Sequence, residues 1–360
     1  MEYIQRILIL ILVSVIYIGP AYGMHKLIIS IYPSLYALSL SMLTFGLGTF
    51  PLGNFLVRWK LNKYTAFVEE LGGIFLYVYT FAVIFWFIYL FASKFSFIYK
   101  NRASIFIGYF VIVAIMGIIG YFRAINIRLS SYEIENKNIS KNIKILMFAD
   151  VHLSQISKKD LVAKIGNIVE KQKPDLILIA GDIIDTDTKL ILHDYDKDFQ
   201  KIKAPMGVYA SVGNHEYYGG LDENIKYIKN KGINLLYEEG IETEEFYIVG
   251  RSYSFGKRKT IEELTKGNTN NKPVIVIDHS PKESQSFMES KSFLQVSGHT
   301  HNGQFFPYNL ITKLMFKPDW GIWSENNSHV ITTCGVGYWG IPIRFPSFAE
   351  VVEINVLKEN

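Results

Sequence analysis

Four long runs without a charged side chain occupy the first third of the chain and set the strongest limit on its fold. They cover residues 7–24, 27–57, 71–93 and 103–122. Each reaches the roughly 18 to 20 apolar residues that cross the hydrocarbon core of a bilayer. No Asp occurs before Asp150, which favours membrane helices over buried core helices. The sequence therefore predicts four N-terminal transmembrane helices in a multi-pass protein of the cell membrane.

Two of these runs allow a second interpretation. The second run is longer than one helix requires and contains Pro33, Pro51 and several glycines, so part of it is expected to form a loop or an interfacial segment. The first run follows a short basic lead and ends near Ala21 and Gly23, which resembles the cleavage site of a secretory signal. A cleaved signal is thus the alternative to a first membrane helix.

The orientation in the membrane rests on the basic residues of the short loops. With the N-terminus inside, six basic side chains lie on the inner side, namely Arg6, Arg58, Lys60, Lys63, Arg123 and Arg128. Four lie outside, namely Lys26, Lys94, Lys100 and Arg102. This difference predicts that the C-terminal domain faces the cytoplasm.

The net charge of +4 is unevenly divided along the chain. Residues 1–123 carry nine Lys and Arg against three Glu, whereas the remainder carries 28 basic and 30 acidic side chains. The basic surplus lies where anionic lipid headgroups would be, so membrane lipids are expected partners. The C-terminal half is slightly acidic and so lacks the excess of basic side chains that binds the phosphates of nucleic acid. Nucleic acid is therefore not expected as a partner. The single cysteine, Cys334, excludes an internal disulfide.

From about residue 128 the pattern changes to short apolar runs that alternate with amphipathic segments. The sequence predicts three regions: a transmembrane region at 1–123, a linker and first strand at 124–142, and a C-terminal domain at 143–360. Buried strands are predicted at 143–149, 175–180, 208–212, 274–277 and 293–296. Helices are predicted after Ser157 and at 222–231 and 282–291, and antiparallel returning strands at 330–333 and 351–356. This alternation indicates an α/β domain whose sheets are covered by helices.

Five short motifs place metal-binding types of side chain directly after apolar strands. They hold Asp150 and His152; Asp182 and Asp185; Asn214, His215 and Glu216; His279; and His299 with His301. In open α/β sheets, ligands gather beyond the carboxyl ends of the strands, so these loops should converge in space. Five of the eight histidines lie in these motifs, which random core or surface histidines would not do.

In this order the motifs resemble the calcineurin-like metallophosphoesterases, whose pattern runs Asp-x-His, Gly-Asp-x-x-Asp, Gly-Asn-His-Glu, His and Gly-His-x-His. The resemblance implies an α/β/β/α sandwich. The apolar N-terminal helices, with Gly337, Arg344 and Glu350 in the tail, are similar to the membrane-associated YkuE/YaeI-like branch. Asn302 stands where that branch often has glycine, and Ala349 replaces a proline. Neither is an expected metal ligand.

The resemblance implies a phosphoester hydrolase with two divalent metal ions, Mn²⁺ first among them and Fe, Zn, Co or Ni as alternatives. Two cations neutralise charge on a phosphoryl group and supply a metal-bound hydroxide as nucleophile. By position in the family pattern, Asp182 would bridge the metals. The other ligands would be Asp150, His152 and His301 on one metal, and Asn214, His279 and His299 on the other.

His215 is expected to contact the phosphate and to donate a proton to the leaving oxygen. Asp185 is expected to orient its imidazole and to favour the charged form, although a purely structural turn carboxylate is the alternative. Glu216 is expected to hold its loop in place rather than to take part in the reaction.

The substrate expected from this arrangement is a phosphoester or pyrophosphate, and a lipid-linked one because the chain is anchored. The aromatic stretch at 305–323 is either a buried insertion or an apolar rim that accepts acyl chains. Two alternatives stay open: a phosphodiesterase for small soluble substrates whose helices are only an anchor, and a non-catalytic membrane scaffold.

Overall fold

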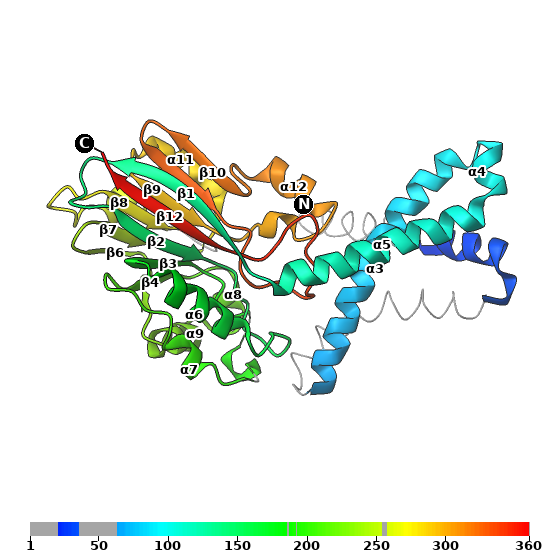
Figure 1. Ribbon diagram of the computed structural model, residues 1–360, viewed down its shortest axis with the longest axis horizontal. Helices are drawn as coiled ribbons and strands as arrows, with labels where there is room; N and C mark the ends of the chain where they lie inside the picture. The colour runs from blue at the N-terminus through cyan, green and yellow to red at the C-terminus, as the bar shows by residue number, and fades with distance from the viewer. Residues whose placement is uncertain (1–20, 36–62, 186, 192, 254–257, 360) are drawn as a thin grey trace, which may run out of the picture. The chain divides into compact units, whose positions relative to one another are not determined.

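The computed structural model describes residues 21–35, 63–185, 187–191, 193–253 and 258–359. The chain divides into two compact units, residues 1–117 and residues 118–360 (Figure 1). The predicted boundaries at 123/124 and 142/143 stay a prediction.

The first unit is helical. Residues 21–31 form a helix, followed by a 3₁₀ turn (η1, Pro33–Leu35) and the helices α3 (Lys63–Ala92), α4 (Ser96–Lys100) and α5 (Arg102–Ile125). Hydrogen bonds of 2.9 Å from the Tyr77 hydroxyl to the Val113 carbonyl and from the Tyr109 hydroxyl to the Phe81 carbonyl join α3 to α5. These bonds satisfy the phenol groups inside an otherwise apolar contact.

Among the described residues, two helices are long and apolar enough to cross a membrane, Glu70–Ala92 and Arg102–Ile125. They coincide with the third and fourth predicted runs. The predicted runs at 7–24 and 27–57 lie largely outside the described residues, so four transmembrane helices are not established. The most apolar window of α5 is only 11% buried, which leaves its side chains free to meet lipid.

The second unit contains two six-stranded sheets. In the first, in the order β1-β12-β2-β3-β4-β5, neighbouring strands are parallel except β12 and β2. Its strands are β1 (Arg128–Asn136), β2 (Ile143–Phe148), β3 (Leu176–Ala180), β4 (Val208–Ser211), β5 (Asn234–Leu235) and β12 (Glu350–Lys358). In the second, in the order β10-β11-β9-β8-β7-β6, the two end pairs are antiparallel and the centre is parallel. Its strands are β6 (Glu239–Glu242), β7 (Tyr247–Gly250), β8 (Val274–Ile277), β9 (Leu294–Ser297), β10 (Gly321–Glu325) and β11 (Ser328–Thr332).

Helices cover the outer face of each sheet, and Figure 1 shows α6 and α9 on one side of the strands and α11 on the other. The longer helices are α6 (Leu161–Gln172), α9 (Leu221–Asn230) and α12 (Tyr308–Met315). Shorter ones are η2 (Thr188–Leu190), α7 (Asp196–Phe199), α8 (His215–Tyr218), α10 (Ile261–Leu264), η3 (Pro281–Glu283), α11 (Ser284–Glu289) and η4 (His301–Gly303).

Alternation along β2 shows how the layers form. Ile145 and Met147 pack between the two sheets, whereas Leu146 and Phe148 pack against the helices outside the first sheet. Because successive side chains of a strand point to opposite faces, a strand buried on both sides must be apolar throughout. The unit is therefore a sandwich of two sheets between helical layers, as the resemblance implied.

The five predicted catalytic strands are present as β2, β3, β4, β8 and β9, and the predicted helices as α6, α9 and α11. The predicted direction of one of the two returning strands was partly wrong. The two predicted returning strands correspond to β11 and β12, of which β12 runs antiparallel to β2. β11 runs parallel to β9 and antiparallel only to β10. The intervening β10 runs back to the starting edge of the sheet, and this makes the parallel pairing of β11 with β9 possible.

The last two turns of α5, residues 118–125, belong to the second unit and are bonded to the loop before β12. The Arg344 amide donates to the Gly120 carbonyl at 3.0 Å, and the Ala349 amide donates to the Arg123 carbonyl at 3.0 Å. The Arg123 side chain donates to the Ser347 carbonyl at 3.0 Å. The end of a candidate membrane span is thus built directly into the second unit.

This contact predicts a difference between two glycines of α5. A Cβ at Gly120 would lie 2.8 Å from Ile343 Cγ2, whereas a Cβ at Gly108 meets nothing within 4 Å. Gly120→Ala should therefore destabilise the second unit by about 1 to 3 kcal/mol, as overpacking does. Gly108→Ala, the matched control, should be neutral or slightly stabilising because alanine favours helix. Thermal unfolding of the full chain in detergent checks this, and equal melting temperatures for both variants would show that the contact at Gly120 is loose.

Candidate metal centre

The predicted site residues follow the carboxyl ends of five strands. Asp150 and His152 follow β2, Asp182 and Asp185 follow β3, and Asn214 and His215 follow β4. His279 follows β8 in the second sheet, and His299 and His301 follow β9. These strands run parallel within each sheet, so their carboxyl ends meet at one edge. The expected convergence of the five loops is observed.

Unusual backbone conformations mark these loops. Five of the predicted metal ligands have positive φ angles: Asp150 (56°), His152 (50°), Asp182 (52°), His299 (73°) and His301 (49°). Such conformations cost energy for side-chain-bearing residues and persist only where the surroundings hold them. Their concentration in these loops indicates that the direction of the side chains is maintained here at the cost of backbone strain.

A first group of possible metal ligands consists of Asp150, His152 and His301. The Nε2 atoms of His152 and His301 lie 3.1 Å apart, and His301 Nε2 lies 3.4 Å from Asp150 Oδ1. His152 donates Nδ1–H to Asp185 Oδ1 at 3.0 Å, which leaves its Nε2 lone pair directed at the group. Three possible ligand atoms therefore converge on one place.

A second group consists of Asp182, His279 and His299. His279 donates Nδ1–H to the Ala180 carbonyl at 2.7 Å, and its Nε2 lies 3.1 Å from Asp182 Oδ2. The same Asp182 oxygen lies 3.8 Å from His152 Nε2 in the first group. Asp182 is therefore the carboxylate shared by the two groups.

One buried polar atom at the site, Asn214 Oδ1, has no hydrogen-bond partner, whereas His279 Nε2 faces Asp182 Oδ2. The amide nitrogen of Asn214 donates to the Tyr218 hydroxyl at 3.2 Å, so the orientation with Oδ1 free is the one the network supports. Unpaired buried acceptors are costly unless something occupies them. A divalent cation fits this donor set, which joins imidazole, carboxylate and amide oxygen without thiolate.

His215 and Asp185 are in contact, as predicted, but Asp185 serves two histidines. Its Oδ1 lies 3.1 Å from His215 Nδ1 and 3.0 Å from His152 Nδ1. His215 also donates to the Asp185 carbonyl at 2.7 Å. Burial disfavours a charged His215, but the hydrogen bond with Asp185 and the charge of Asp182 outweigh it and raise the pKa of His215 to about 9. His215 is therefore protonated at neutral pH.

The histidines of the two groups differ in charge. Burial and the charge of His279 lower the pKa of His299 to about 3, and burial and Arg344 lower the pKa of His301 well below its usual value. Burial opposes a charged His279, yet the carboxylate of Asp182 outweighs it and raises the pKa of His279 to about 10. A proton on His279 balances Asp182 here, and a bound cation would displace it.

Glu216 holds the loops after β3 and β4 together. Its fully buried carboxylate accepts from the amides of Asp182 (3.0 Å), Ile183 (2.7 Å), Ile184 (3.0 Å) and Gly213 (2.7 Å). Bonds from several amides to one carboxylate are strong and directional. The predicted structural role of this residue matches its contacts.

Arg344 contacts the site and was not among the predicted site residues. Its fully buried guanidinium donates to the Gly337 carbonyl at 2.9 Å, the Cys334 carbonyl at 2.6 Å and His301 Nδ1 at 3.0 Å. Arginine cannot accept a hydrogen bond, so a neutral His301 carries its proton on Nε2. A cation at Nε2 would require the imidazole proton to move to Nδ1, so the contact between Nδ1 and Arg344 would have to rearrange. No spacing of ligand types marks Arg344, and only its place in the family resemblance could have indicated it.

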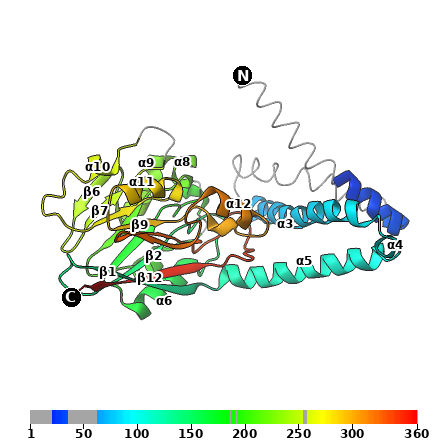
Figure 2. The same cartoon turned by 90° about the horizontal axis from the view of Figure 1, so that it is seen from above.

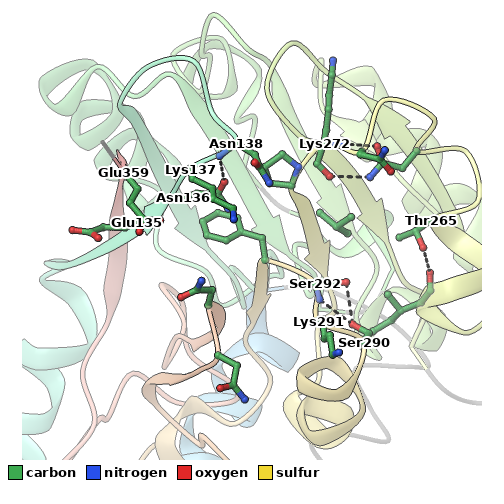
Figure 3. A pocket seen from close by; sticks show the side chains of 18 of the residues that line it. Glu135, Asn136, Lys137, Asn138, Thr265, Lys272, Ser290, Lys291, Ser292 and Glu359 are labelled. Atoms are coloured by element: carbon green, nitrogen blue, oxygen red, sulfur yellow. Dashed lines mark hydrogen bonds between the residues drawn. The ribbon is translucent and has the colours of Figure 1, made fainter.

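A pocket of about 220 Å³ opens over the groups, lined among others by Asp182, Asn214, His215, His299 and Trp339. A second pocket, of about 480 Å³, lies at the amino ends of β8 and β9, the opposite edge from the metal-ligand groups. Figure 3 shows Asn136, Lys137 and Glu359 on one side of it and Lys272 and Ser290 on the other. None of the predicted site residues lines the second pocket.

Residues 143–318 match the protein family described as calcineurin-like phosphoesterase. The chain is 30% identical over 257 residues to a metallophosphoesterase of Aquifex aeolicus, and this match covers 68% of the chain and 97% of that protein. The chain spans 62% of the length of the metallophosphoesterases of Helicobacter pylori that it also matches.

Two other relatives bear on the membrane-associated branch. A transmembrane protein with metallophosphoesterase domain from Danio rerio is 27% identical over 235 residues, which covers 60% of this chain and 53% of that protein. The metallophosphoesterase YkuE of Bacillus subtilis is 26% identical over 235 residues, which covers 60% of this chain and 80% of that protein. The resemblance noted from the motifs is confirmed.

The contacts of Glu216 predict that charge and shape both matter at this position. Glu216→Gln replaces an acceptor oxygen by an amide group that faces backbone N–H donors, which should cost about 1 to 3 kcal/mol. We expect a lower melting temperature and weaker binding of divalent metal. Glu223→Gln, at an exposed carboxylate of α9, is the control and should leave both unchanged. The measurements are thermal unfolding and metal titration, and wild-type values for Glu216→Gln would remove the role assigned to this carboxylate.

Proposed function

Because the chain belongs to the calcineurin-like phosphoesterase family, we propose that it hydrolyses phosphoester or pyrophosphate bonds at a dinuclear metal centre. The observation that carries this proposal is the position of Asp182, whose Oδ2 lies near both groups of possible ligands. A carboxylate so placed can bridge two cations.

The residues that would hold the two ions are those of the two groups. Asp150, His152 and His301 would hold one, and Asn214, His279 and His299 the other, with Asp182 between them. Mn²⁺ suits this mixed set, as do Fe, Zn, Co and Ni. Two bound cations would neutralise the phosphoryl oxygens and activate a water molecule for attack.

His215 is proposed to donate the proton that the leaving oxygen needs. It lines the pocket above Asp182, and the contacts with Asp185 keep it charged and fix its ring. With Nδ1–H donated to Asp185, the Nε2–H group is available for the leaving oxygen. Asp185 thus acts on the reaction through His215 and also orients His152.

The proposed substrate is a lipid-linked phosphoester at the surface of the cell membrane, with the catalytic unit on the cytoplasmic side. The Ser347 hydroxyl donates to the His301 carbonyl at 2.7 Å, and the Ser347 carbonyl accepts from Arg123 near the end of α5. Ser347 therefore links the end of a candidate membrane span to a proposed metal ligand through two hydrogen bonds. A pocket of about 220 Å³ is smaller than typical sites for drug-sized ligands, so acyl chains would remain outside it.

Metal removal tests the proposed centre. Chelation should abolish hydrolysis of an activated aryl phosphoester by the full chain, and added Mn²⁺ should restore it. Asp182→Ala should lower both metal content and activity, because no neighbouring side chain can take the place between the cations. Activity and metal content are measured on the same preparation. Full activity with undiminished metal in this variant would refute the assignment of Asp182.

The proposed proton donor predicts a dependence on the leaving group. His215→Ala should keep metal content near wild type but slow turnover by on the order of 10² to 10⁴, the usual contribution of a general acid. The loss should shrink for esters whose leaving group needs no proton. His329→Ala, in β11 outside the predicted site, is the control. Equal losses for good and poor leaving groups would limit His215 to binding the phosphate.

The orientation is tested separately. The distribution of basic loop residues predicts that a reporter fused after Asn360 behaves as cytoplasmic in intact cells. Labelling of that reporter from outside by an impermeant reagent would contradict the cytoplasmic orientation and leave the chemistry untouched.

A further inference from the structure

Helix α12 presents its apolar side chains to the outside. None of its eight residues is buried. Leu314 is 88% exposed, Met315 65%, Leu310 50% and Ile311 48%. Leu310 and Leu314 are one turn apart, as are Ile311 and Met315, so the two pairs form one broad face of the helix. A soluble domain ordinarily turns such a face inward, so this exposed patch requires a partner.

The polar side of the same helix faces the protein. The Thr312 hydroxyl lies 3.1 Å from Asp319 Oδ2, and the Thr300 hydroxyl donates to the Asp319 carbonyl at 2.6 Å. Tyr308 packs edge-on against the buried ring of Phe305, with 5.2 Å between the ring centres. These contacts hold α12 with its apolar face outward.

The helix is joined to both the site and the end of α5. It follows η4, which contains His301, and Gly303 of η4 has no room for a Cβ because the Asn309 backbone packs against it. The Phe306 amide donates to the Phe345 carbonyl at 2.7 Å, next to Arg344, which is bonded to Gly120. Figures 1 and 2 both show α12 at the end of the sandwich where the chain passes from α5 into β1.

We propose that α12 is an interfacial helix that rests on the lipid bilayer through Leu310, Ile311, Leu314 and Met315. The occupant of this surface is the bilayer rather than a second protein, because the end of a candidate membrane span lies only a few hydrogen-bonded residues away. Two exposed lysines, Lys313 in α12 and Lys317 just after it, suit anionic headgroups, although Lys317 also lies 4.0 Å over the ring of Trp323. This inference rests on the proposed function and adds to it the surface through which the protein would contact the lipid that carries the substrate.

The arrangement limits the substrate class. Gly303 and Gln304, which line the pocket, are separated from the start of α12 only by Phe305, Phe306 and Pro307. With α12 in the headgroup layer, the pocket mouth lies at the depth of lipid phosphates. The phosphoester that enters is then one carried by a membrane lipid, with its acyl chains left in the bilayer beneath α12.

The direct test is the depth of α12, which does not require catalysis. Leu314→Cys in the full chain is labelled with an environment-sensitive fluorophore and placed in nanodiscs of phosphatidylethanolamine and phosphatidylglycerol. Native Cys334 is fully buried and serves as the unlabelled background in wild type. Lys229→Cys, exposed on α9, is the matched control. We expect a blue-shifted emission at position 314 that doxyl-labelled lipids quench, and neither effect at position 229.

Two results would overturn the assignment: emission at position 314 as solvent-exposed as at position 229, or shielding that doxyl lipids do not quench together with disulfide-linked chains. The second result would assign the surface to another copy of the chain.

Activity then separates this inference from the proposed function. Replacing Leu314 and Met315 together by serine should lower kcat/KM for a phosphoester embedded in the nanodisc by about tenfold or more, since interfacial binding scales with buried apolar area. Hydrolysis of a soluble aryl phosphoester should change less than about twofold. Equal losses on both substrates would contradict a docking role. Lipid quenching without hydrolysis of any lipid phosphoester would keep the interfacial helix and refute the proposed substrate.

Discussion

Two buried carboxylates, Asp150 and Asp182, lie close enough to repel each other, and the surrounding structure depends on how this charge is balanced. His152 Nε2 lies 3.8 Å from an oxygen of each. Burial and Asp182 raise the pKa of Asp150, whereas contact with His279 lowers that of Asp182 despite its burial. Buried charges of like sign are tolerated only when paired or coordinated. Histidines from both sheets supply this pairing, and divalent cations would supply more of it.

The frame around these carboxylates is built from backbone groups and close glycines. A Cβ at Gly213 would lie 2.8 Å from the Asp182 amide and would also clash with its carboxylate. At Gly335 it would lie 2.7 Å from Asp150 Cβ. Glu216 binds the amides of the β3 and β4 loops, and Arg344 binds the carbonyls of the loop that carries Gly337. These supports explain how the site keeps five strained backbone conformations.

Much of the site was predictable because metal-ligand residue types directly follow apolar strands, and parallel strands bring their ends together. The contacts of Arg344 were not predictable. They are made to backbone carbonyls and to one imidazole, and the loop that contains Arg344 has no regular spacing of apolar or ligand residues. The double role of Asp185 also depends on distances that sequence order does not encode. Helix α12 shows a further limit: its composition suggested either a buried insertion or an apolar rim. The exposure of Leu310 and Leu314 in the structure, with Thr312 and Tyr308 turned inward, shows that its leucines face out.

The central claim is that two cations share Asp182, and the number and coupling of bound metals tests it most directly. Full chain loaded with Mn²⁺ and freed of excess metal should contain about two ions per chain. Its electron paramagnetic resonance spectrum should show an exchange-coupled pair, as expected for ions about 3.5 to 4 Å apart. A single uncoupled Mn²⁺ per chain, with full hydrolytic activity, would contradict the account.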